Sequence, residues 1–303
     1  MTVIMKRLVP IICITAALLV AGCEETPAGG GGSKGPEELT NLKITASVST
    51  WGTESPLERD DRVGLYASAP FNVDNLMLTV GDAMSLIPSR DLIWQADSTV
   101  SSVTFVAYAP YSASYSGRYV TFSARQDQKS ESGVKASDLM MAKADVRPMS
   151  ASVNLSFAHK MVRIGIYFDN RSGKEIAGVR FDNAVLAVMA DMDRCAVWQD
   201  SLVSVPERVN LAQYTDGSGK VYYAAIVAPQ TEMFTGMVTF ADGSSQPLQL
   251  SQYRTFDSGQ QWDNRSDPIV LEADRPQDST DVPAQFDVSI SDWADGDQLS
   301  FTR

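Results

Sequence analysis

The amino-acid sequence predicts an all-β protein made of antiparallel β-sandwich domains, and three observations support this fold class. Apolar residues recur at every second position in many short segments, which is the period of a half-buried strand. Turn-forming residues separate these segments at intervals of about 8–15 residues, as in sandwich folds. Apolar spacing of the helical kind is hard to find over any long stretch. The length of 303 residues gives room for about two domains.

The amino terminus has the pattern of a bacterial lipoprotein leader. Lys6 and Arg7 precede an apolar run over residues 8–21, which is too short for a comfortable permanent membrane span. Small residues then lead to Cys23, as in a lipobox. We expect residues 1–22 to be a signal peptide and the Cys23 thiol to carry the lipid whose acyl chains anchor the protein. The alternative is an ordinary secretory signal followed by a chance cysteine.

A flexible tether is expected to follow the lipidated cysteine. Residues 23–40 contain a run of four glycines at 29–32, with Pro27 and Pro36 on either side. No later apolar stretch reaches the length of a membrane span. The sequence therefore predicts a protein that is anchored to a membrane and does not pass through it.

The first predicted strand follows the tether directly. Leu42, Ile44, Ala46 and Val48 alternate with polar residues, so one face is apolar and the other polar. The next segment, residues 50–61, is polar and rich in turn formers.

Further strands are predicted in the first half of the chain, over residues 62–67, 103–108 and 119–122. Pro148 and several small residues in the stretch 147–156 mark a domain boundary. We therefore expect a first sandwich domain over residues 41–152 and a second over residues 153–303.

The second half repeats this pattern without an exact sequence repeat. Its predicted strands cover residues 162–168, 179–189, 221–227, 237–240, 247–250 and 286–290. Leu299 and Phe301 are two positions apart and predict a short final strand.

Charge and cysteine content narrow the possible functions. The formal net charge is −12 and the sequence pI is about 4.6, so the surface repels nucleic acid. Of the three cysteines, Cys13 lies in the leader and Cys23 in the lipobox, which leaves Cys195 without a partner for a disulfide. We expect Cys195 to be a small buried apolar residue.

The sequence lacks the usual motifs of an enzyme. His159 is the one histidine, and neither a nucleophile elbow nor a phosphate-binding loop occurs. We expect a structural histidine, no catalytic residue, no cofactor and no metal. The pairs Asp191/Asp193 and Asp295/Asp297 lack the remainder of a calcium-binding loop and are predicted to lie in solvated turns. A glycosidase built from two distant carboxylates is not excluded by counting.

The tryptophans allow two interpretations. Their wide spacing is typical of separate core residues, whereas exposed rings would suit a carbohydrate-binding surface. They stand at Trp51, Trp94, Trp198, Trp262 and Trp293.

Six short segments with recognisable motifs occur in order along the chain. They are Val63-Gly64-Leu65-Tyr66 after Asp61, Phe105-Val106-Ala107-Tyr108-Ala109-Pro110-Tyr111, Ser137-Asp138-Leu139-Met140 before Ala142, Leu155-Ser156-Phe157-Ala158-His159-Lys160-Met161, Ala228-Pro229-Gln230-Thr231 and Ile290-Ser291-Asp292-Trp293. Taken in this order, they resemble the fimbrillin family of Bacteroidetes surface lipoproteins. The resemblance covers about residues 42–293, nearly all of the mature chain. The resemblance also accounts for His159 as a residue of the fold at the domain junction, without catalysis.

The resemblance implies two transthyretin-like sandwich domains in tandem and a role in type V pili at the outer membrane. In such pilins an arginine-directed or trypsin-like protease cuts after the first strand, and a strand of another subunit fills the groove that opens. Carried over to this chain, Leu42, Ile44, Ala46 and Val48 form the exchangeable strand. Arg59 and Arg62 are the nearest arginines behind it, and Arg59 is preferred because Arg62 begins the next predicted strand.

The partners implied are other fimbrial subunits and the outer membrane, reached through the lipid. Leu299 and Phe301 are the candidate donor strand, although few residues follow Trp293. The stalk, tip and anchor roles stay open. The alternative is an outer-membrane lipoprotein that binds a glycan or a host protein and does not polymerise.

Overall fold

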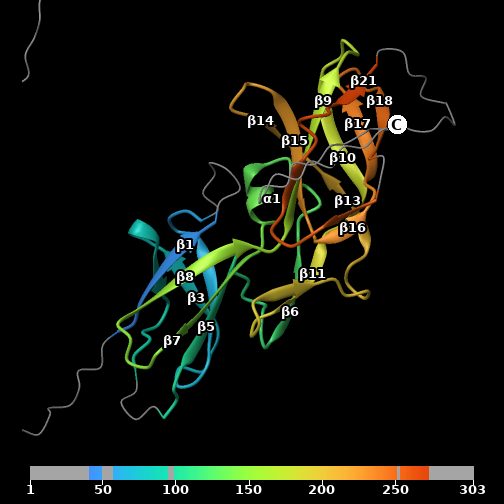
Figure 1. Cartoon of the computed structure of the whole chain (residues 1–303). Coiled ribbons are helices and arrows are strands. Elements are labelled where there is room, and N and C mark those ends of the chain that lie inside the picture. The colour runs from blue at the N-terminus through green and yellow to red at the C-terminus, as the bar shows by residue number, and fades with distance from the viewer. Residues whose placement is uncertain (1–40, 50–56, 95–98, 251–252, 273–303) are drawn as a thin grey trace, which may run out of the picture. The chain divides into compact units, whose positions relative to one another are not determined.

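In this computed structural model, the regular secondary structure of the described residues is almost entirely β-strand (Figure 1). The structure describes residues 41–49, 57–94, 99–250 and 253–272. The all-β prediction is confirmed. No helix among these described residues is long and apolar enough to cross a membrane.

The first sheet closes into a barrel in the strand order β1-β4-β3-β2-β5-β7-β8. Its strands are β1 Lys43–Val48, β2 Arg62–Ala67, β3 Val73–Val80, β4 Ser85–Pro88, β5 Val103–Ala109, β7 Met140–Val146 and β8 Ser152–His159. A short 3-10 helix, η1 Asp82–Met84, precedes β4. The barrel is closed because β1 pairs with β4 on one side and with β8 on the other.

The other strands form smaller sheets. One sheet has the order β12-β11-β6, with β12 Ala196–Trp198, β11 Ala187–Asp191 and β6 Tyr119–Ser123. A second has the order β13-β10-β17-β18, with β13 Pro206–Asn210, β10 Ile176–Val185, β17 Thr235–Phe240 and β18 Ser245–Gln249. A third has the order β14-β15-β9-β20, with β14 Ala212–Thr215, β15 Val221–Val227, β9 Val162–Asn170 and β20 Gln261–Asp263, and β21 Ile269–Leu271 also pairs with β9. The last pair is β16 Gln230–Glu232 with β19 Arg254–Phe256.

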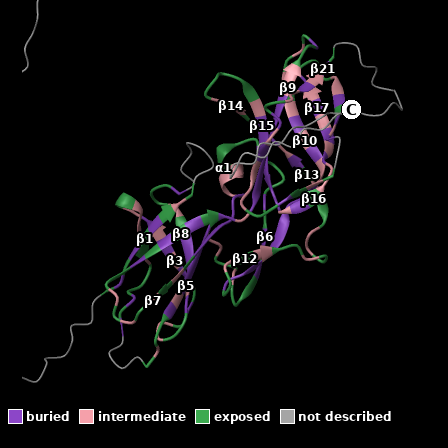
Figure 2. Ribbon diagram, in the orientation of Figure 1, coloured by how far each residue is buried: buried purple, intermediate pink, exposed green. Residues whose placement is uncertain are grey.

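Two apolar clusters make up the core of the described residues. One fills the barrel and contains inward-facing residues of β1, β2, β3, β5 and β8. The other gathers residues of β6, β9, β10, β15 and β17. Strand β5 belongs to both, because Phe105 and Ala107 face the first cluster while Val106 and Tyr108 face the second. Figure 2 shows the buried residues along the strands and the exposed ones mostly in the connections.

The helix α1, Glu131–Lys135, interrupts the run of strands between β6 and β7. The Ser130 hydroxyl caps its first turn by accepting a hydrogen bond from the Gly133 amide at 3.1 Å. The helix is too short to produce a recognisable apolar period, which explains why the sequence did not predict it.

The structure corrects the predicted strand over residues 179–189. This run contains the end of β10 and the start of β11, which belong to different sheets. The Val185 carbonyl accepts a hydrogen bond from Ala228, whereas the Leu186 carbonyl accepts one from Ala124. The pairing partner therefore changes at this point, and a continuous apolar run does not reveal the change because both strands are buried.

The strand pairs of the described residues are mainly antiparallel, as predicted, with three exceptions. Strand β1 runs parallel to β8, and both β20 and β21 run parallel to β9. Periodicity fixes which residues share a face but not which strands become neighbours.

The described residues all belong to one compact unit, Leu39–Arg303. The domain division at 152/153 therefore stays a prediction. The predicted strands at 286–290 and 299–301 lie outside the described residues.

Candidate functional site

The first strand, β1, lies in the barrel wall between β4 and β8 (Figure 1). It pairs in parallel with β8 over its full length, from Lys43 opposite Ser152 to Val48 opposite Phe157. Its antiparallel pairing with β4 is shorter and joins Ile44 to Leu86 and Thr45 to Ser85. The strand is therefore held mainly by β8.

The inner face of β1 is apolar and packs into the barrel. Leu42, Ile44 and Ala46 are buried in the first apolar cluster, and Val48 is half-buried against it. The alternation expected from the sequence therefore matches the burial along this strand. Each of these side chains fills a separate position on the inner wall, because successive inward-facing residues are two apart.

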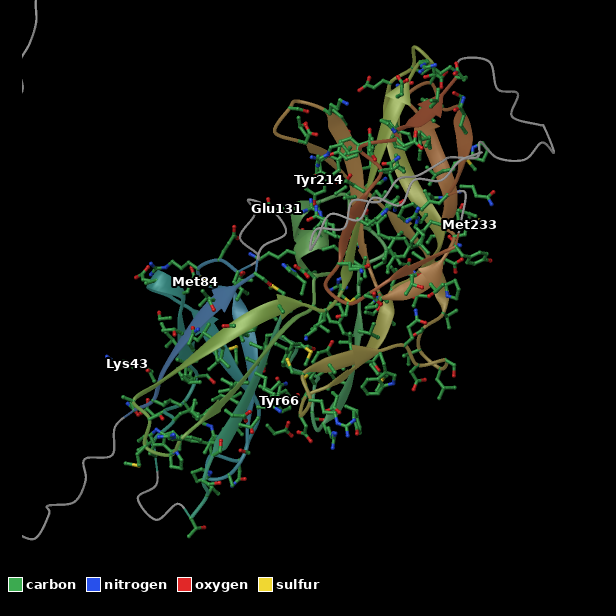
Figure 3. The ribbon with its side chains drawn as sticks, viewed as in Figure 1. Lys43, Tyr66, Met84, Glu131, Tyr214 and Met233 are labelled. Carbon is green, nitrogen blue, oxygen red and sulfur yellow. The ribbon has the colours of Figure 1, made fainter. Side chains whose placement is uncertain are left out.

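The outer face of β1 is polar and is bonded to the outer face of β8. Thr45 Oγ1 donates to Asn154 Oδ1 at 3.2 Å, and the hydroxyl groups of Ser47 and Ser156 lie 3.0 Å apart. Figure 3 labels Lys43 at the start of this exposed face. A shift of one residue would bury these polar groups and expose the apolar ones, so the register is strongly specified.

Behind β1 the chain passes through residues 50–56, which are not described, and then a turn that leads into β2. Leu57 is buried in the barrel core, whereas the Arg59 side chain is 66% exposed and pairs with Asp82. Asp60 has a φ of 71°, which marks the turn. Arg62 lies opposite Thr79 in the β2–β3 ladder. The structure thus places Arg59 in a surface turn and Arg62 in a paired strand.

Lys135, at the end of α1, holds this turn from a distant part of the sequence. Its Nζ lies 2.7 Å from Glu58 Oε2 and 2.8 Å from Asp61 Oδ2. Burial opposes the charge of Lys135, but the hydrogen bonds to Asp61 and Glu58 outweigh it, and the pKa of Lys135 is raised. The hydrogen bond from Lys135 lowers the pKa of Glu58. Neither periodicity nor spacing predicts this contact, because it joins elements that are separated by several strands.

A small cavity lies beside the same turn. Its volume is about 370 Å³, and its lining includes Leu57, Tyr111, Lys135 and Met140. The turn after β1 therefore borders this cavity.

Three predicted site residues lie outside the described part of the chain. These are the lipidation site Cys23 and the donor-strand residues Leu299 and Phe301. Their roles stay predictions.

His159 lies at the end of β8 and is buried. Its Nδ1 is 2.9 Å from both carboxylate oxygens of Asp138, and it pairs with Met140 in the β7–β8 ladder. This arrangement ties the end of β8 to the segment that follows α1. It agrees with the structural role expected from the sequence.

Asp191 corrects one expectation. The sequence predicts a solvated turn there, but the residue is 4% exposed, and its carboxylate accepts hydrogen bonds from Arg118 at 2.9 and 3.1 Å. The hydrogen bond from Arg118 and the amides of Arg194 and Asp193 lower the pKa of Asp191 to about 2, against the opposing effect of burial. The described residues contain no group of His, Cys, Asp and Glu side chains that could hold a metal ion.

Cys195 and the tryptophans differ in their surroundings. Cys195 is half-buried, in the turn between β11 and β12, rather than fully buried. Trp94 and Trp262 are buried core residues, whereas Trp198 on β12 is 40% exposed. Trp51 and Trp293 lie outside the described residues.

Comparison with known proteins finds solved structures with a similar fold. The fold resembles that of a proposed cell adhesion protein from Bacteroides ovatus, with a TM-score of 0.62 and 15% identity over 86% of this chain and 100% of that one. It also resembles a proposed cell adhesion protein from Bacteroides uniformis, with a TM-score of 0.61 and 18% identity over 84% of this chain and 99% of the other. A fimbrial protein from Bacteroides vulgatus gives a TM-score of 0.50 and 13% identity over 84% and 100%.

At these identities the likeness concerns the fold. A comparison with curated proteins found no match. The model of the fimbrillin-like family, however, matches residues 47–293, from within β1 to beyond the last described strand. Because this match covers most of the sequence, the chain belongs to the fimbrillin-like family.

Proposed function

We propose that this protein is a structural subunit of a cell-surface fimbria. It is exported as a lipoprotein through Cys23, reaches the outer membrane, and is assembled when proteolysis lets β1 be exchanged for a strand of another subunit. The observation that carries the proposal is the position of β1, which closes the barrel between β4 and β8. The role is structural and adhesive, without catalysis.

The energetics of strand loss support exchange. Without β1, the facing edges of β4 and β8 lack their ladder partners, and unpaired edges recruit other strands. The positions of Leu42 and Ile44 also become empty. Each such side chain contributes about 1.5–3 kcal/mol when it is fully buried, so the opened barrel has a strong tendency to accept a replacement.

The barrel strands that remain after β1 has left determine which strand can replace it. Strand β8 runs parallel to β1 and offers a full-length ladder, so an incoming strand adds by β-augmentation in the same direction. It needs apolar residues at alternate positions to fill the inner wall and small polar residues to meet Asn154 and Ser156. Leu299 and Phe301 have the required spacing and are the proposed donor residues.

The geometry favours Arg59 as the cleavage site. A protease needs an accessible and locally extendable segment. Arg59 is exposed in a turn, whereas cleavage after Arg62 would cut inside β2 and disrupt the barrel that must receive the donor. The released segment would then consist of β1 and the chain up to Arg59, including the buried Leu57.

The test is assembly after a single cut. Purified full-length protein in detergent is treated with an arginine-specific protease, and the products are followed by light scattering and electron microscopy. We expect the protein cut after Arg59 to form polymers and the uncut protein to stay monomeric. A cut protein that keeps its fold and stays monomeric would contradict the proposal.

The same experiment distinguishes the fimbrial subunit from the alternative, a ligand-binding lipoprotein. A lipoprotein that binds a ligand and never polymerises would remain monomeric after the cut. The observation that favours ligand binding is the exposed Trp198.

A further inference from the structure

The short helix α1 lies in a segment with a buried polar side chain at each of its ends. We call residues 125–138 the α1 segment, and Figure 3 labels Glu131 at the start of the helix. Gln128 precedes the helix and Ser137 follows it, and both are 0% exposed. A helix of five residues has little stability of its own, so its position depends on contacts outside it.

Gln128 joins the α1 segment to β15. Its Nε2 donates to the Ile226 carbonyl at 2.8 Å, and its Oε1 accepts from the Ile226 amide at 2.8 Å. Strand β9 pairs with β15 at Ile226 on one side, whereas β14 pairs with the other side from Val221 to Ala224 and stops short of Ile226. The Gln128 amide therefore takes the place of a ladder partner. Because a buried amide that loses its partner is costly, this contact fixes Gln128 on β15.

The helix packs directly against the chain at Gln128. A Cβ atom at Gly133 would lie 2.6 Å from the Asp127 carbonyl oxygen and 3.2 Å from Gln128 Cα, so only a glycine allows this approach. At the other end of the helix, the Ser137 hydroxyl donates to the Gly133 carbonyl at 2.7 Å and accepts from the Arg125 amide at 2.9 Å. The position of Gln128 therefore sets the position of the helix.

Lys135 connects the helix to the turn around Arg59. It stands in the last turn of α1, and its Nζ bridges Glu58 and Asp61, which flank Arg59 in the sequence. A displaced helix would draw Nζ away from both carboxylates. A continuous series of contacts thus runs from β15 through the α1 segment to the turn.

We propose that Gln128 and Ser137 are positioning residues that hold α1 on β15. With the helix held there, Lys135 restrains the turn around Arg59, and the sheet that contains β15 controls how readily the turn is cut. This inference rests on the cleavage after Arg59 proposed above and adds its regulation by the second half of the chain. Coupling through packed and hydrogen-bonded groups shows itself as non-additive effects of paired variants.

The test is the rate at which an arginine-specific protease cuts after Arg59 in the full-length protein in detergent. Mass spectrometry follows the appearance of the new amino terminus at Asp60. Gln128→Ala should speed this cut about two- to fivefold, as the loss of the Lys135 ion pairs would. Ser137→Ala, a smaller truncation at the other end of the helix, should also speed the cut and replaces Gln128→Ala if that variant does not fold.

Asn264→Ala is the matched control. Asn264 is also 0% exposed, and its side chain bonds the amide and the carbonyl of Tyr167 on β9 at 2.6 and 3.1 Å. A general loss of stability would speed the cut in both variants, whereas the proposed positioning speeds it only in Gln128→Ala. The rates are compared at a temperature at which the melting curves show every variant folded.

A paired variant tests whether the effect passes through Lys135. Gln128→Ala combined with Lys135→Ala should be cut no faster than Lys135→Ala alone. Two independent effects would instead multiply to about 4- to 25-fold.

The pKa of Glu58 gives a readout that needs no protease. The hydrogen bond from Lys135 lowers this pKa, so Gln128→Ala should raise it toward its ordinary value and Asn264→Ala should leave it low. NMR titration of the Glu58 carboxyl measures the change.

Three results would overturn the inference. They are parental cleavage rates with a low Glu58 pKa in Gln128→Ala and Ser137→Ala, equal changes in Asn264→Ala, and multiplied rates in the paired variant. A parent protein that is not cut after Arg59 would count against the proposed function instead, and the Glu58 titration would still decide whether Gln128 positions Lys135.

Discussion

At the scale of single residues, the turn after β1 is held by a small number of side chains. Leu57 anchors it in the barrel core, and Lys135 bridges Glu58 and Asp61 on its outer side. The Arg59 side chain is largely exposed and pairs with Asp82 instead. The proposed cleavage site therefore lies in a turn that these contacts hold in place.

The choice between the two arginines is the first prediction. Arg59→Gln should prevent cleavage of this turn by an arginine-specific protease, because Arg62 is paired with Thr79 in β2. Arg62→Gln is the matched control and should be cut like the parent, giving a new amino terminus at Asp60. Amino-terminal sequencing of the products measures this. A new terminus at Val63 in the parent would show that the wrong arginine was chosen.

The lysine bridge gives a second prediction. Lys135→Ala should speed cleavage after Arg59 about two- to fivefold, the range expected for an ion pair near the surface. Lys129→Ala removes an exposed lysine close to α1 and serves as the control. The rate is followed by mass spectrometry of the released fragment. Equal rates for the parent and Lys135→Ala would mean that the bridge does not restrain the turn.

Asp191 gives a prediction for acid stability. Its pKa is lowered to about 2 from an ordinary value of 3.8, chiefly by the hydrogen bond from Arg118. A lowered pKa in the folded state stabilises the protein above the unfolded value, and this stabilisation is lost as the pH falls through the folded value. The difference in melting temperature between the parent and Asp191→Asn should therefore shrink between about pH 4 and pH 2. A difference that stays constant over this window would exclude a role for the Asp191 charge.

At the scale of elements, the sequence identified strands with one apolar face, such as β1, and short apolar runs, such as β5. Strand β1 was predicted because Leu42, Ile44, Ala46 and Val48 alternate with polar residues, and its burial follows that pattern. Strands β3 and β4 were missed because turn residues interrupt the segment between them and hide the period. The helix α1 was missed because it has only five residues.

The sequence did not predict which strands pair with one another. A period of two assigns each side chain to a face but carries no information on which strands are neighbours. The parallel alignment of β1 with β8 joins residues more than one hundred positions apart, as between Thr45 and Asn154. Lys135 and Glu58, whose contact is the basis of the proposed restraint, are likewise far apart in the sequence. Periodicity therefore could not predict their contact.

The packing of β1 gives a prediction at this scale. Ile44→Ala should lower the free energy of unfolding by about 2–4 kcal/mol, because a buried side chain is truncated and a cavity remains. Thr45→Ala, one position along on the exposed face, should cost less than about 1 kcal/mol. Denaturant unfolding of the uncut protein measures both. Similar costs for the two variants would mean that β1 is not seated as described.

At the scale of the whole molecule, β1 closes a barrel without pairing with β2, the strand that follows it in the sequence. Its partners β4 and β8 come from later parts of the chain, and the segment that joins it to β2 carries the exposed Arg59. A strand connected in this way can leave after one cut without unravelling the ladder between β2 and β3.

The most direct test of exchange uses a labelled peptide of residues 41–49. Full-length protein cut after Arg59 is incubated with the peptide, and fluorescence anisotropy follows its uptake. We expect one peptide to bind each cut molecule, the uncut protein to bind none, and a peptide carrying Ile44→Asp to fail because a carboxylate would enter the barrel core. A cut protein that remains folded and takes up no peptide, or uptake that is equal for the two peptides, would contradict the account.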